Sequence, residues 1–356
     1  MLFSTPLIRA IRQAFPTAYL AYLCNRRTEE ILLRNPHLDE LFIYEKDELV
    51  ALWRRHWWLG FQAVWALLAR IRRRRFHVVF DLSLGERYSF FLALLGVPQR
   101  IGFDFRRRGR FLTHRLTMDG YDGQHVVEYY AQLLDMVGIR LRDRQFELAM
   151  LEEDRLVVDR YLQEEGIEPG QRLIGMIPAG GVSWGGQADF RRWFHEGFVT
   201  VGRALGQRPD VKILVFGETR DADACAHLTA AIGPSALNLS GRTALGEFVA
   251  FIQRCELVIA NDGGPIHIAA SQGAKTVSIF GPVDPDVYGP YPRSTGRHWV
   301  VYRDDLPCRP CYHRFKLPPC PYERACLTGV TPEDVLRACE AALTHPQAVC
   351  ANEPAG

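Results

Sequence analysis

Short apolar runs alternate with amphipathic stretches along the whole chain, and the two patterns predict different elements. Runs of four to eight apolar residues without polar alternation are typical of parallel strands covered on both faces. In the first half they predict strands at 18–23, 41–44, 77–82 and 100–102. Apolar residues at helical spacing predict helices at 4–15, 27–34, 51–75 and 89–95. Strands and helices that alternate in this way indicate an α/β sheet with helices on both faces.

The same alternation begins again in the second half of the chain. It predicts strands at 172–177, 211–216, 257–260 and 276–280, and helices at 151–165, 194–205, 222–232, 245–254 and 266–272. The turn residues Gly166, Pro169 and Gly170 separate the halves. We therefore expect an N-terminal domain at 1–165, a C-terminal domain at 171–335, and a final helix and tail at 336–356. Two doubly wound units indicate two lobes with a cleft between them, and such sheets bind ligands at the carboxyl ends of their strands.

The composition is that of a soluble globular protein, with 356 residues of which 47% are hydrophobic and 24% charged. No apolar run reaches the roughly 18 to 20 residues that a membrane span needs. The start of the chain, with Pro6, Arg9 and Arg12 directly after Met1–Phe3, is unlike a secretory signal. We therefore expect a cytoplasmic protein.

Charge is divided unevenly along the chain. Residues 1–150 contain 23 Lys and Arg against 16 Asp and Glu, and the remainder contains 20 against 25. The stretch 51–75 holds four tryptophans and seven arginines, and no acidic residue lies between Leu49 and Phe80. Two alternatives follow: a helix that binds an anionic membrane surface, or a packed helix with a solvated arginine face. Nucleic acid is the weaker partner, because no interleaved binding motif accompanies the charge.

Four cysteines near the C-terminus form a cluster, with Cys308 and Cys311 at the spacing of a zinc knuckle. The second pair, Cys320 and Cys326, is irregularly spaced, and proline is frequent between the pairs. The cluster therefore has two interpretations, a structural metal site or free thiols in a surface loop, and the irregular spacing favours free thiols.

The segment Asn261–Pro265 joins an apolar strand to a helix, and its residues can carry chemistry. Gly263 and Gly264 let the backbone turn tightly and approach a ligand closely. Amides at the start of the next helix favour an anion, above all a pyrophosphate. Asp262 can accept hydrogen bonds from sugar hydroxyls or cap the helix, and His267 can donate one to a phosphate oxygen. The alternative is a turn in which these residues serve only the local conformation.

The stretch 238–291, NLSGRTALGEFVAFIQRCELVIANDGGPIHIAASQGAKTVSIFGPVDPDVYGPY, resembles the C-terminal signature of glycosyltransferase family 9, the lipopolysaccharide heptosyltransferases. The segments TPLIRAIRQAFP, NPHLDELFIY, VVFDLSLGERYSFFLALLGVPQRIGFD and CRPCY…CLTGVTPEDVL resemble further parts of the family, in the family's order. The resemblance covers nearly the whole chain. It implies the GT-B fold, in which two Rossmann-like domains face a cleft, the N-terminal one binding the acceptor and the C-terminal one the nucleotide-sugar.

The resemblance implies roles for the residues of the glycine segment. Asp262, Gly263, Gly264 and His267 match the family's Asp-Thr-Gly-x-x-His donor motif, with Gly263 where threonine is frequent. A glycine there keeps the backbone amide and loses a hydroxyl.

Two further donor contacts are implied outside that segment. Arg191-Arg192-Trp193 stands where the family has Lys-x-Trp, whose lysine contacts a donor phosphate. Arginine binds phosphate in a bidentate manner, so the exchange is not neutral. Glu218 matches an acidic residue that holds the nucleoside ribose. The alternatives are a surface cation for Arg191 and an exposed helix cap for Glu218.

The chain departs from the family at its start. Family members begin with a strand and a Gly-Asp pair, and that Asp is the proposed catalytic base. Met1 stands about where the residue after the pair would be, so the first strand of the N-terminal domain and the base would lie upstream of Met1. We interpret Asp81 and Glu86 as structural or acceptor-binding residues rather than as the base. Acceptor phosphates are expected to be bound by Arg106, Arg107 and Arg108.

The resemblance implies an inverting transfer of a sugar, such as heptose from ADP-heptose, to a lipopolysaccharide core or related glycan. The donor is a nucleotide-sugar, the acceptor a phosphorylated glycolipid or glycan, and no cofactor is required. A peripheral contact with the inner membrane follows from such an acceptor. Two alternatives remain: a non-catalytic nucleotide-sugar-binding protein that lacks the base, and a sugar-nucleotide epimerase. The epimerase would usually carry a GxGxxG motif near its first strand, which is not visible here.

Overall fold

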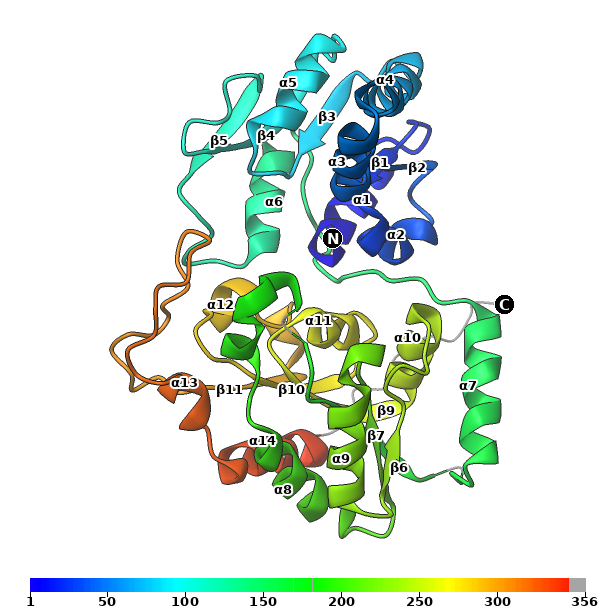
Figure 1. Ribbon diagram of the computed structural model, residues 1–356, viewed down its shortest axis with the longest axis vertical. Helices are drawn as coiled ribbons and strands as arrows, with labels where there is room; N and C mark the ends of the chain where they lie inside the picture. Colours follow the sequence, from blue (N-terminus) through cyan, green and yellow to red (C-terminus); the bar gives the residue numbers. More distant parts are fainter. Residues whose placement is uncertain (169, 181, 346–356) are drawn as a thin grey trace. The chain divides into compact units, whose positions relative to one another are not determined.

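Figure 1 shows the computed structural model of the chain, which describes residues 1–168, 170–180 and 182–345. Pro169 of the expected boundary and the expected tail, 346–356, lie outside the described residues. The chain divides into two compact units. Unit 1 contains Met1–Ala149 together with two short later segments, Asp286–Tyr288 and Tyr312–Leu317, and unit 2 contains the rest.

Unit 2 is built on one six-stranded parallel sheet with the strand order β11-β10-β9-β6-β7-β8. The strands are β6 (Arg172–Ile177), β7 (Val211–Val215), β8 (Ala236–Asn238), β9 (Cys255–Asn261), β10 (Lys275–Ile279) and β11 (His298–Val301). From the central β6 the chain builds outward to β7 and β8, and then returns to the other side of β6 with β9. The strand order therefore reverses between β6 and β9, and ligands of doubly wound sheets bind at the carboxyl ends beside such a switch point.

Helices cover both faces of this sheet, as the unbroken apolar strands predict. They are α7 (Glu152–Glu164), α8 (His195–Gly206), α9 (Ala222–Ile232), α10 (Leu245–Arg254), α11 (Gly264–Ser271) and α14 (Pro332–Thr344). Alternate strand residues face opposite sides, so Ile213 packs with α8, α9 and α14, whereas Leu214 packs with α7, α10 and α11. Each fully buried residue of this size contributes about 1.5 to 3 kcal/mol. The shorter elements are η2 (Val182–Arg191), η3 (Thr219–Asp221), α12 (Pro285–Tyr288), η4 (Arg293–Thr295) and α13 (Ala325–Thr328).

Unit 1 contains two parallel sheets that are not hydrogen-bonded to each other, β1-β2 and β3-β4-β5. The strands are β1 (Ala21–Cys24), β2 (Glu40–Ile43), β3 (Val78–Asp81), β4 (Gln99–Phe105) and β5 (His114–Met118). The helices are η1 (Leu2–Ser4), α1 (Thr5–Ala14), α2 (Arg26–Leu33), α3 (Lys46–Arg55), α4 (Trp57–Arg73), α5 (Glu86–Leu94) and α6 (Val126–Asp135). Phe315, from the later segment, packs on Phe105 and Tyr121 with ring centroids 5.3 and 5.4 Å apart, which attaches that segment to unit 1.

The single helix expected at 51–75 is wrong, because the structure has two helices there, α3 and α4. His56 between them is extended, with φ −153° and ψ 106°. Gly60 lies against the indole ring of Trp53, and a Cβ on Gly60 would lie 2.1 Å from that ring. The glycine therefore allows the two helices to approach closely, a requirement that helical spacing alone does not reveal. Among the described residues, no helix is both long and apolar enough to cross a membrane.

The pH dependence of stability provides a test of the packing around β11. Burial, assisted by Arg297 and Arg293, lowers the pKa of His298 from 6.5 to about 4. The unfolded chain therefore takes up a proton between pH 6.5 and 4 that the folded chain does not, so the free energy of unfolding should fall across this range as pH decreases. Replacement by His298→Gln should make that fall shallower in urea titrations at several pH values. The exposed His227 on α9 supplies the control, because His227→Gln should leave the slope unchanged.

Candidate functional site

The loops after β6 and β9 are joined by one buried side chain at the switch point of unit 2. The amide nitrogen of Asn261 donates to the carbonyl of Pro178 at 2.7 Å, and its oxygen accepts from the backbone N–H of Trp193 at 2.9 Å. The Trp193 indole is itself buried and donates to the carbonyl of Val330 at 3.0 Å. These bonds fix the segment that carries Arg191 beside the end of β9.

Arg191 and Asp262 lie within two residues of these hydrogen-bonded groups and form a buried, bidentate ion pair. The guanidinium Nε lies 2.8 Å from one carboxylate oxygen, and Nη2 lies 2.5 Å from the other. The side chains are 12% and 1% exposed. The guanidinium also lies over the ring of Trp184, 4.9 Å from its centroid. Both carboxylate oxygens therefore face Arg191, and the carboxylate of Asp262 holds that guanidinium in place.

The helix α11 begins directly after this pair. Gly263 precedes its first turn, and no side chain caps the helix, so the capping role considered for Asp262 is not seen. A Cβ on Gly264 would meet nothing within 4 Å, so packing within the chain does not require a glycine there. His267 lies in the first turn and is 8% exposed. The uncapped amides give this end of the helix a partial positive charge that suits an anion.

Glu218 lies at the same carboxyl edge of the sheet, after β7. The order β9-β6-β7 separates it from Asp262 by two strand spacings, or about 10 Å. Its side chain is exposed and forms an ion pair with Arg220, and its backbone N–H donates to the carboxylate of Asp221, the last residue of η3. Of the residues predicted from the sequence, the structure brings Arg191, Asp262 and the start of α11 together, and it places Glu218 further along the carboxyl edge of the sheet.

The predicted acceptor-binding arginines lie in unit 1, directly after β4. Arg106 and Arg107 have left-handed backbone conformations with φ of 52° and 61°. Arg106 lies over the ring of Phe105, 4.7 Å from its centroid, and the turn that contains the three arginines is closed by the Gly109 N–H, which donates to Asp104 at 2.8 Å. All three arginines are exposed, and none has a carboxylate within ion-pair distance among the described residues.

The two acidic residues interpreted as structural or acceptor-binding have partners in unit 1. Asp81 is buried at the end of β3, where it accepts a hydrogen bond from the Ser83 N–H at 3.0 Å, and burial raises the pKa of its carboxyl. Glu86 forms an ion pair with Arg110. These contacts stabilise the turn into α5 and its neighbouring loop.

The thiols of the cysteine cluster influence one another electrostatically. Burial, with the neighbouring thiols of the cluster as a further cause, raises the pKa of Cys311, and raises that of Cys326 to about 11. Within the residues that the structure describes, no group of three or more His, Cys, Asp or Glu side chains is placed to hold a metal ion.

Sequence reasoning missed two participants in the site. Trp184 supports the guanidinium of Arg191 from a glycine-rich segment whose pattern gave no element. Arg192 donates from Nε to the carbonyl of Gly180 at 2.8 Å, which ties the same segment to the loop after β6. No regular spacing in the sequence indicates these contacts, because both lie within the irregular connection between β6 and α8.

A double-mutant cycle tests whether Arg191 and Asp262 act as a unit. Asp262→Asn should lower the free energy of unfolding by about 3 kcal/mol, because it leaves a buried guanidinium without its charge partner. Adding Arg191→Gln should cost less than the sum of the single changes, by about 1 kcal/mol or more, in denaturant titrations. The exposed pair Arg155 and Glu152 supplies the control, and its coupling should stay below about 0.5 kcal/mol. If the losses in free energy of unfolding caused by the two single changes simply add in the double variant, the result would contradict the pairing.

Known proteins match this chain over most of its length. The chain is 23% identical over 316 residues to lipopolysaccharide heptosyltransferase 3 of Escherichia coli, covering 87% of this chain and 88% of that protein. It is 28% identical over 268 residues to lipooligosaccharide heptosyltransferase 2 of Campylobacter jejuni, covering 72% of this chain and 73% of that protein.

Solved structures share the fold. A glycosyl transferase of family 9 from Veillonella parvula matches with a TM-score of 0.78 at 22% identity, covering 96% of this chain and 93% of that one. ADP-heptose lipopolysaccharide heptosyltransferase II of Escherichia coli matches with a TM-score of 0.71 at 20% identity, covering 96% of this chain and 95% of that one. The expected GT-B fold is thereby confirmed. The model of glycosyltransferase family 9 (heptosyltransferase) matches residues 64–317, and the chain therefore belongs to this family of enzymes.

Proposed function

We propose that this enzyme transfers heptose from ADP-heptose to a lipopolysaccharide core, with inversion at the anomeric carbon. Its relatives carry the names of lipopolysaccharide and lipooligosaccharide heptosyltransferases. One related structure is named for ADP-heptose, and another heptosyltransferase of Escherichia coli contains ADP. The observation that carries the proposal is the switch point of unit 2, where Arg191 and the start of α11 meet on residues that resemble the family's donor motif.

The donor diphosphate lies at the start of α11 in this proposal. Arg191 has five N–H donors, and its contacts with Asp262 use Nε and Nη2, so Nη1 is available to a phosphate oxygen. The uncapped helix amides and His267 complete the anion site. Glu218, about 10 Å along the strand edge, is within the reach of the nucleoside ribose. Guanidinium and helix amides can neutralise the departing diphosphate, so we propose that transfer needs no metal ion.

The transfer itself is a displacement at the sugar C1. An acceptor hydroxyl oxygen forms a bond to C1 while the bond from C1 to the diphosphate oxygen breaks, and its electron pair leaves with the diphosphate. The acceptor proton passes to a carboxylate base. Asp81 is not proposed as that base, because its carboxylate accepts a hydrogen bond from the Ser83 N–H in the turn after β3.

Arg106, Arg107 and Arg108 bind acceptor phosphates in this proposal. Three exposed guanidiniums on consecutive residues provide several charge-assisted donors, which suits the phosphates of a phosphorylated glycolipid. The left-handed conformations of Arg106 and Arg107 make the turn in which the three residues lie.

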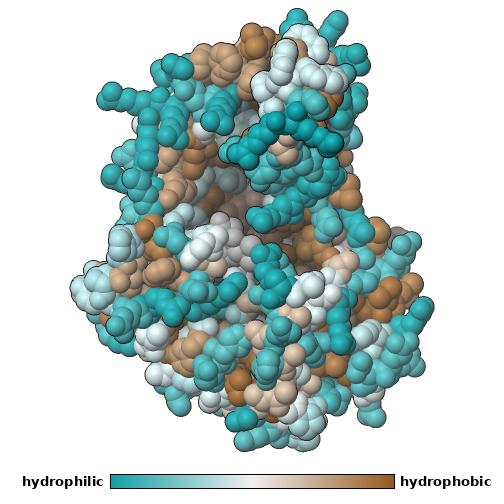
Figure 2. Space-filling view, in the orientation of Figure 1, coloured by the Kyte–Doolittle hydropathy of each residue, from teal (hydrophilic) through white to brown (hydrophobic). Residues whose placement is uncertain are grey.

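A surface on α4 suits the bilayer that carries such an acceptor. Trp57, Phe61 and Trp65 are 71%, 56% and 64% exposed and recur every four residues on one side of the helix. Arg70 and Arg74 pair with Glu40, as a packed helix requires. The remaining arginines of α3, α4 and the following turn are exposed: Arg54, Arg55, Arg72, Arg73 and Arg75. Exposed hydrophobic side chains lie among hydrophilic ones at the top of unit 1 in Figure 2. We propose that this surface contacts the cytoplasmic face of the inner membrane.

Donor use is tested by following ADP release from ADP-heptose with a heptose-deficient lipopolysaccharide acceptor. We expect ADP release that depends on the acceptor, persists in EDTA, and gives a product of inverted anomeric configuration by NMR. Transfer is measured on this chain and on the chain extended through any codons in frame ahead of Met1. Donor binding without transfer by that chain would contradict the proposal.

Two sets of variants serve as controls for each other in this assay. His267→Ala should raise the Kd for ADP about tenfold, because a bond to a charged phosphate is lost, and should leave the acceptor KM unchanged. Combined replacement of Arg106, Arg107 and Arg108 by alanine should raise the acceptor KM about fivefold or more and leave the ADP Kd unchanged. Replacement of the exposed Arg155, Arg160 and Arg337 by alanine should change neither the Kd for ADP nor the acceptor KM.

Vesicle sedimentation tests the membrane surface. The protein should bind phosphatidylglycerol vesicles more strongly than phosphatidylcholine vesicles, because the exposed arginines attract anionic headgroups, and about 0.5 M salt should weaken binding. Serine at Trp57, Phe61 and Trp65 should reduce binding about fivefold or more. The matched control replaces the exposed Leu156, Val157 and Tyr322 of unit 2 by serine. Equal loss of vesicle binding in both variants would mean that α4 has no particular role in membrane contact.

A further inference from the structure

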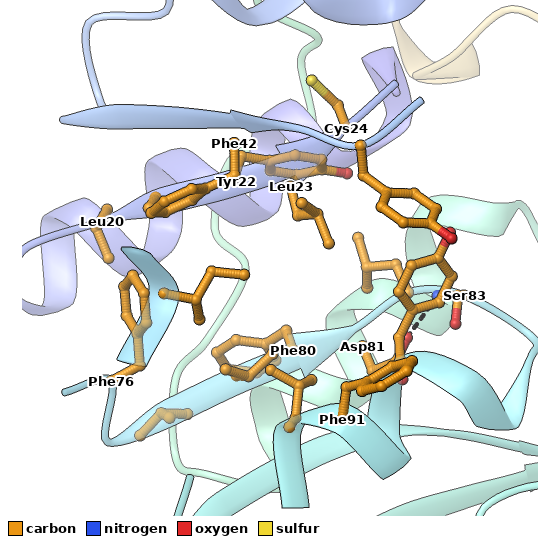
Figure 3. Close-up of a pocket in the computed structure, with 18 of the residues that line it drawn as sticks. Leu20, Tyr22, Leu23, Cys24, Phe42, Phe76, Phe80, Asp81, Ser83 and Phe91 are labelled. Carbon is orange, nitrogen blue, oxygen red and sulfur yellow. Dashed lines mark hydrogen bonds between the residues drawn. The ribbon is translucent and has the colours of Figure 1, made fainter. Parts of the chain in front are cut away.

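Two cavities in the described part of the chain have walls of different character. The larger, of about 1640 Å³, lies in unit 1 between β1 and β3, and its wall is mainly apolar, with side chains such as Leu20, Phe42 and Phe80 (Figure 3). The smaller, of about 220 Å³, lies in unit 2, and its wall contains two arginines, a histidine and an aspartate. Sites that enclose a whole small molecule usually measure about 300 to 1,000 Å³. The smaller cavity therefore suits one small polar group.

Five polar residues line the smaller cavity and define what we name the arginine pocket: Asp189, Arg192, His195, Arg324 and Thr328. Arg192 donates from Nε to the carbonyl of Gly180 at 2.8 Å, and Arg324 donates from Nη1 to the backbone carbonyl of Asp189 at 2.9 Å. These bonds hold both side chains at the wall and use few of their donors. Nη2 of each arginine has no protein partner among the described residues. Since each guanidinium has five N–H donors, the two together can bind an anion through several hydrogen bonds.

The start of α8 adds further donors to the arginine pocket. The helix begins at His195 after the N-cap residue Phe194, and no side chain caps it. Both residues line the pocket. The first N–H groups of a helix have no partner within the helix and, together with its dipole, favour an anion. The imidazole of His195 can also donate from a ring nitrogen. Donors from α8 and from two arginines that are far apart in the chain therefore meet at one small pocket.

One acidic side chain of the pocket, Asp189, opposes an anion. Its carboxylate lies 3.5 Å from Nη1 of Arg192 and is 72% exposed. An ion pair of this length and exposure contributes little to stability, so the carboxylate can turn toward solvent. Two guanidiniums against one carboxylate leave the pocket with a net positive charge. A phosphate group fits this charge, and its oxygens can accept bonds from several of the donors at once.

The arginine pocket is separate from the proposed donor site, although backbone groups connect the two. Among the described residues, Arg191, Asp262 and His267 do not line the pocket. Pro178 and Trp193 do line it, and the backbone groups of both bond to the side chain of Asn261. The consecutive residues Arg191 and Arg192 therefore point to different sites, one holding the donor diphosphate in our proposal and the other lining the arginine pocket.

We infer that the arginine pocket binds one phosphate group, in addition to the diphosphate of the proposed donor site. The phosphate lies between Arg192 and Arg324 and accepts from the first amides of α8. Two sources share this chemistry, free inorganic phosphate and a phosphate of the acceptor glycolipid. Only the second source rests on the proposed function, because the binding of free phosphate is a property of the pocket alone.

Calorimetric titration of the whole chain with inorganic phosphate, with and without saturating ADP, tests the inference. We expect one phosphate to bind, and its binding to persist in ADP. Arg324→Gln should raise the Kd for phosphate about tenfold or more, because hydrogen bonds to a charged group are lost. Arg203→Gln is the matched control, since this exposed arginine lies in the last turn of α8, away from the pocket, and the Kd should stay unchanged.

Asp189→Asn provides a change of opposite sign. It removes a like charge from the pocket, keeps the backbone carbonyl that accepts from Arg324, and should lower the Kd for phosphate about threefold. A network with a purely structural role would not bind phosphate more tightly after this change. Thermal unfolding identifies a variant that fails to fold, and if Arg324→Gln does so, the Kd of Asp189→Asn decides alone.

The acceptor distinguishes the two sources of the phosphate. If the phosphate belongs to the acceptor, Arg324→Gln should raise the KM of the phosphorylated acceptor and leave that of a dephosphorylated acceptor unchanged. If it is free inorganic phosphate, both KM values should stay unchanged while phosphate binding weakens. Either result supports the arginine pocket as a phosphate site.

Three outcomes would overturn the inference. Absence of phosphate binding by the unaltered protein would exclude the site directly. An equal Kd for phosphate in Arg324→Gln, Asp189→Asn and the unaltered protein would mean adventitious binding elsewhere. Loss of phosphate binding in saturating ADP would place the phosphate at the donor site alone. A protein that binds phosphate at the arginine pocket but does not bind ADP would instead contradict the proposed function and leave this inference standing.

Discussion

The buried amide of Asn261 bonds to two loops at once, the carbonyl of Pro178 after β6 and the N–H of Trp193 after η2. Both groups would otherwise be buried backbone atoms without a partner, which costs about as much as a lost hydrogen bond. The same contacts place Arg191, two residues before Trp193, beside Asp262, the residue after Asn261. One side chain therefore converts the topological switch point of the sheet into an ordered cationic site. The geometry of the proposed donor site depends on this side chain more than on any of the glycines.

Asp262 forms an ion pair that its position beside two glycines does not reveal. Its carboxylate is almost completely buried, and both oxygens face the guanidinium of Arg191. A carboxylate next to a phosphate site would repel the ligand unless a cation neutralised it. The ion pair resolves this conflict, since it fixes the orientation of Arg191 while leaving donors of the guanidinium for an anion. The tryptophan beneath the guanidinium restricts it further.

The two units show what a central strand contributes to a doubly wound sheet. In unit 2, β6 separates the helices of the two faces, and its side chains enter both hydrophobic cores. In unit 1, helices α1, α4 and α5 instead border a common cavity, because β1 and β3 do not pair. The proposed surface role of α4 is compatible with this, since the helix turns Leu67, Leu68 and Ile71 toward the cavity and leaves the neighbouring aromatic side exposed.

The sequence by itself determined the strands that are buried on both faces, because an unbroken apolar run has few other places to lie in a folded chain. It also indicated the family, which the family model confirms, whereas the donor loop stays a prediction. It did not reveal β5, whose alternating exposed and half-buried residues include two basic side chains, or the break at His56, which a contact between Trp53 and Gly60 accompanies. Only the tertiary structure decided that α7 packs with unit 2, that Trp184 supports Arg191, and that Asp262 holds the guanidinium. Periodicity records which face of an element is apolar, but it does not record which other residues that face or a given side chain contacts, and these partners are set only when the chain is folded.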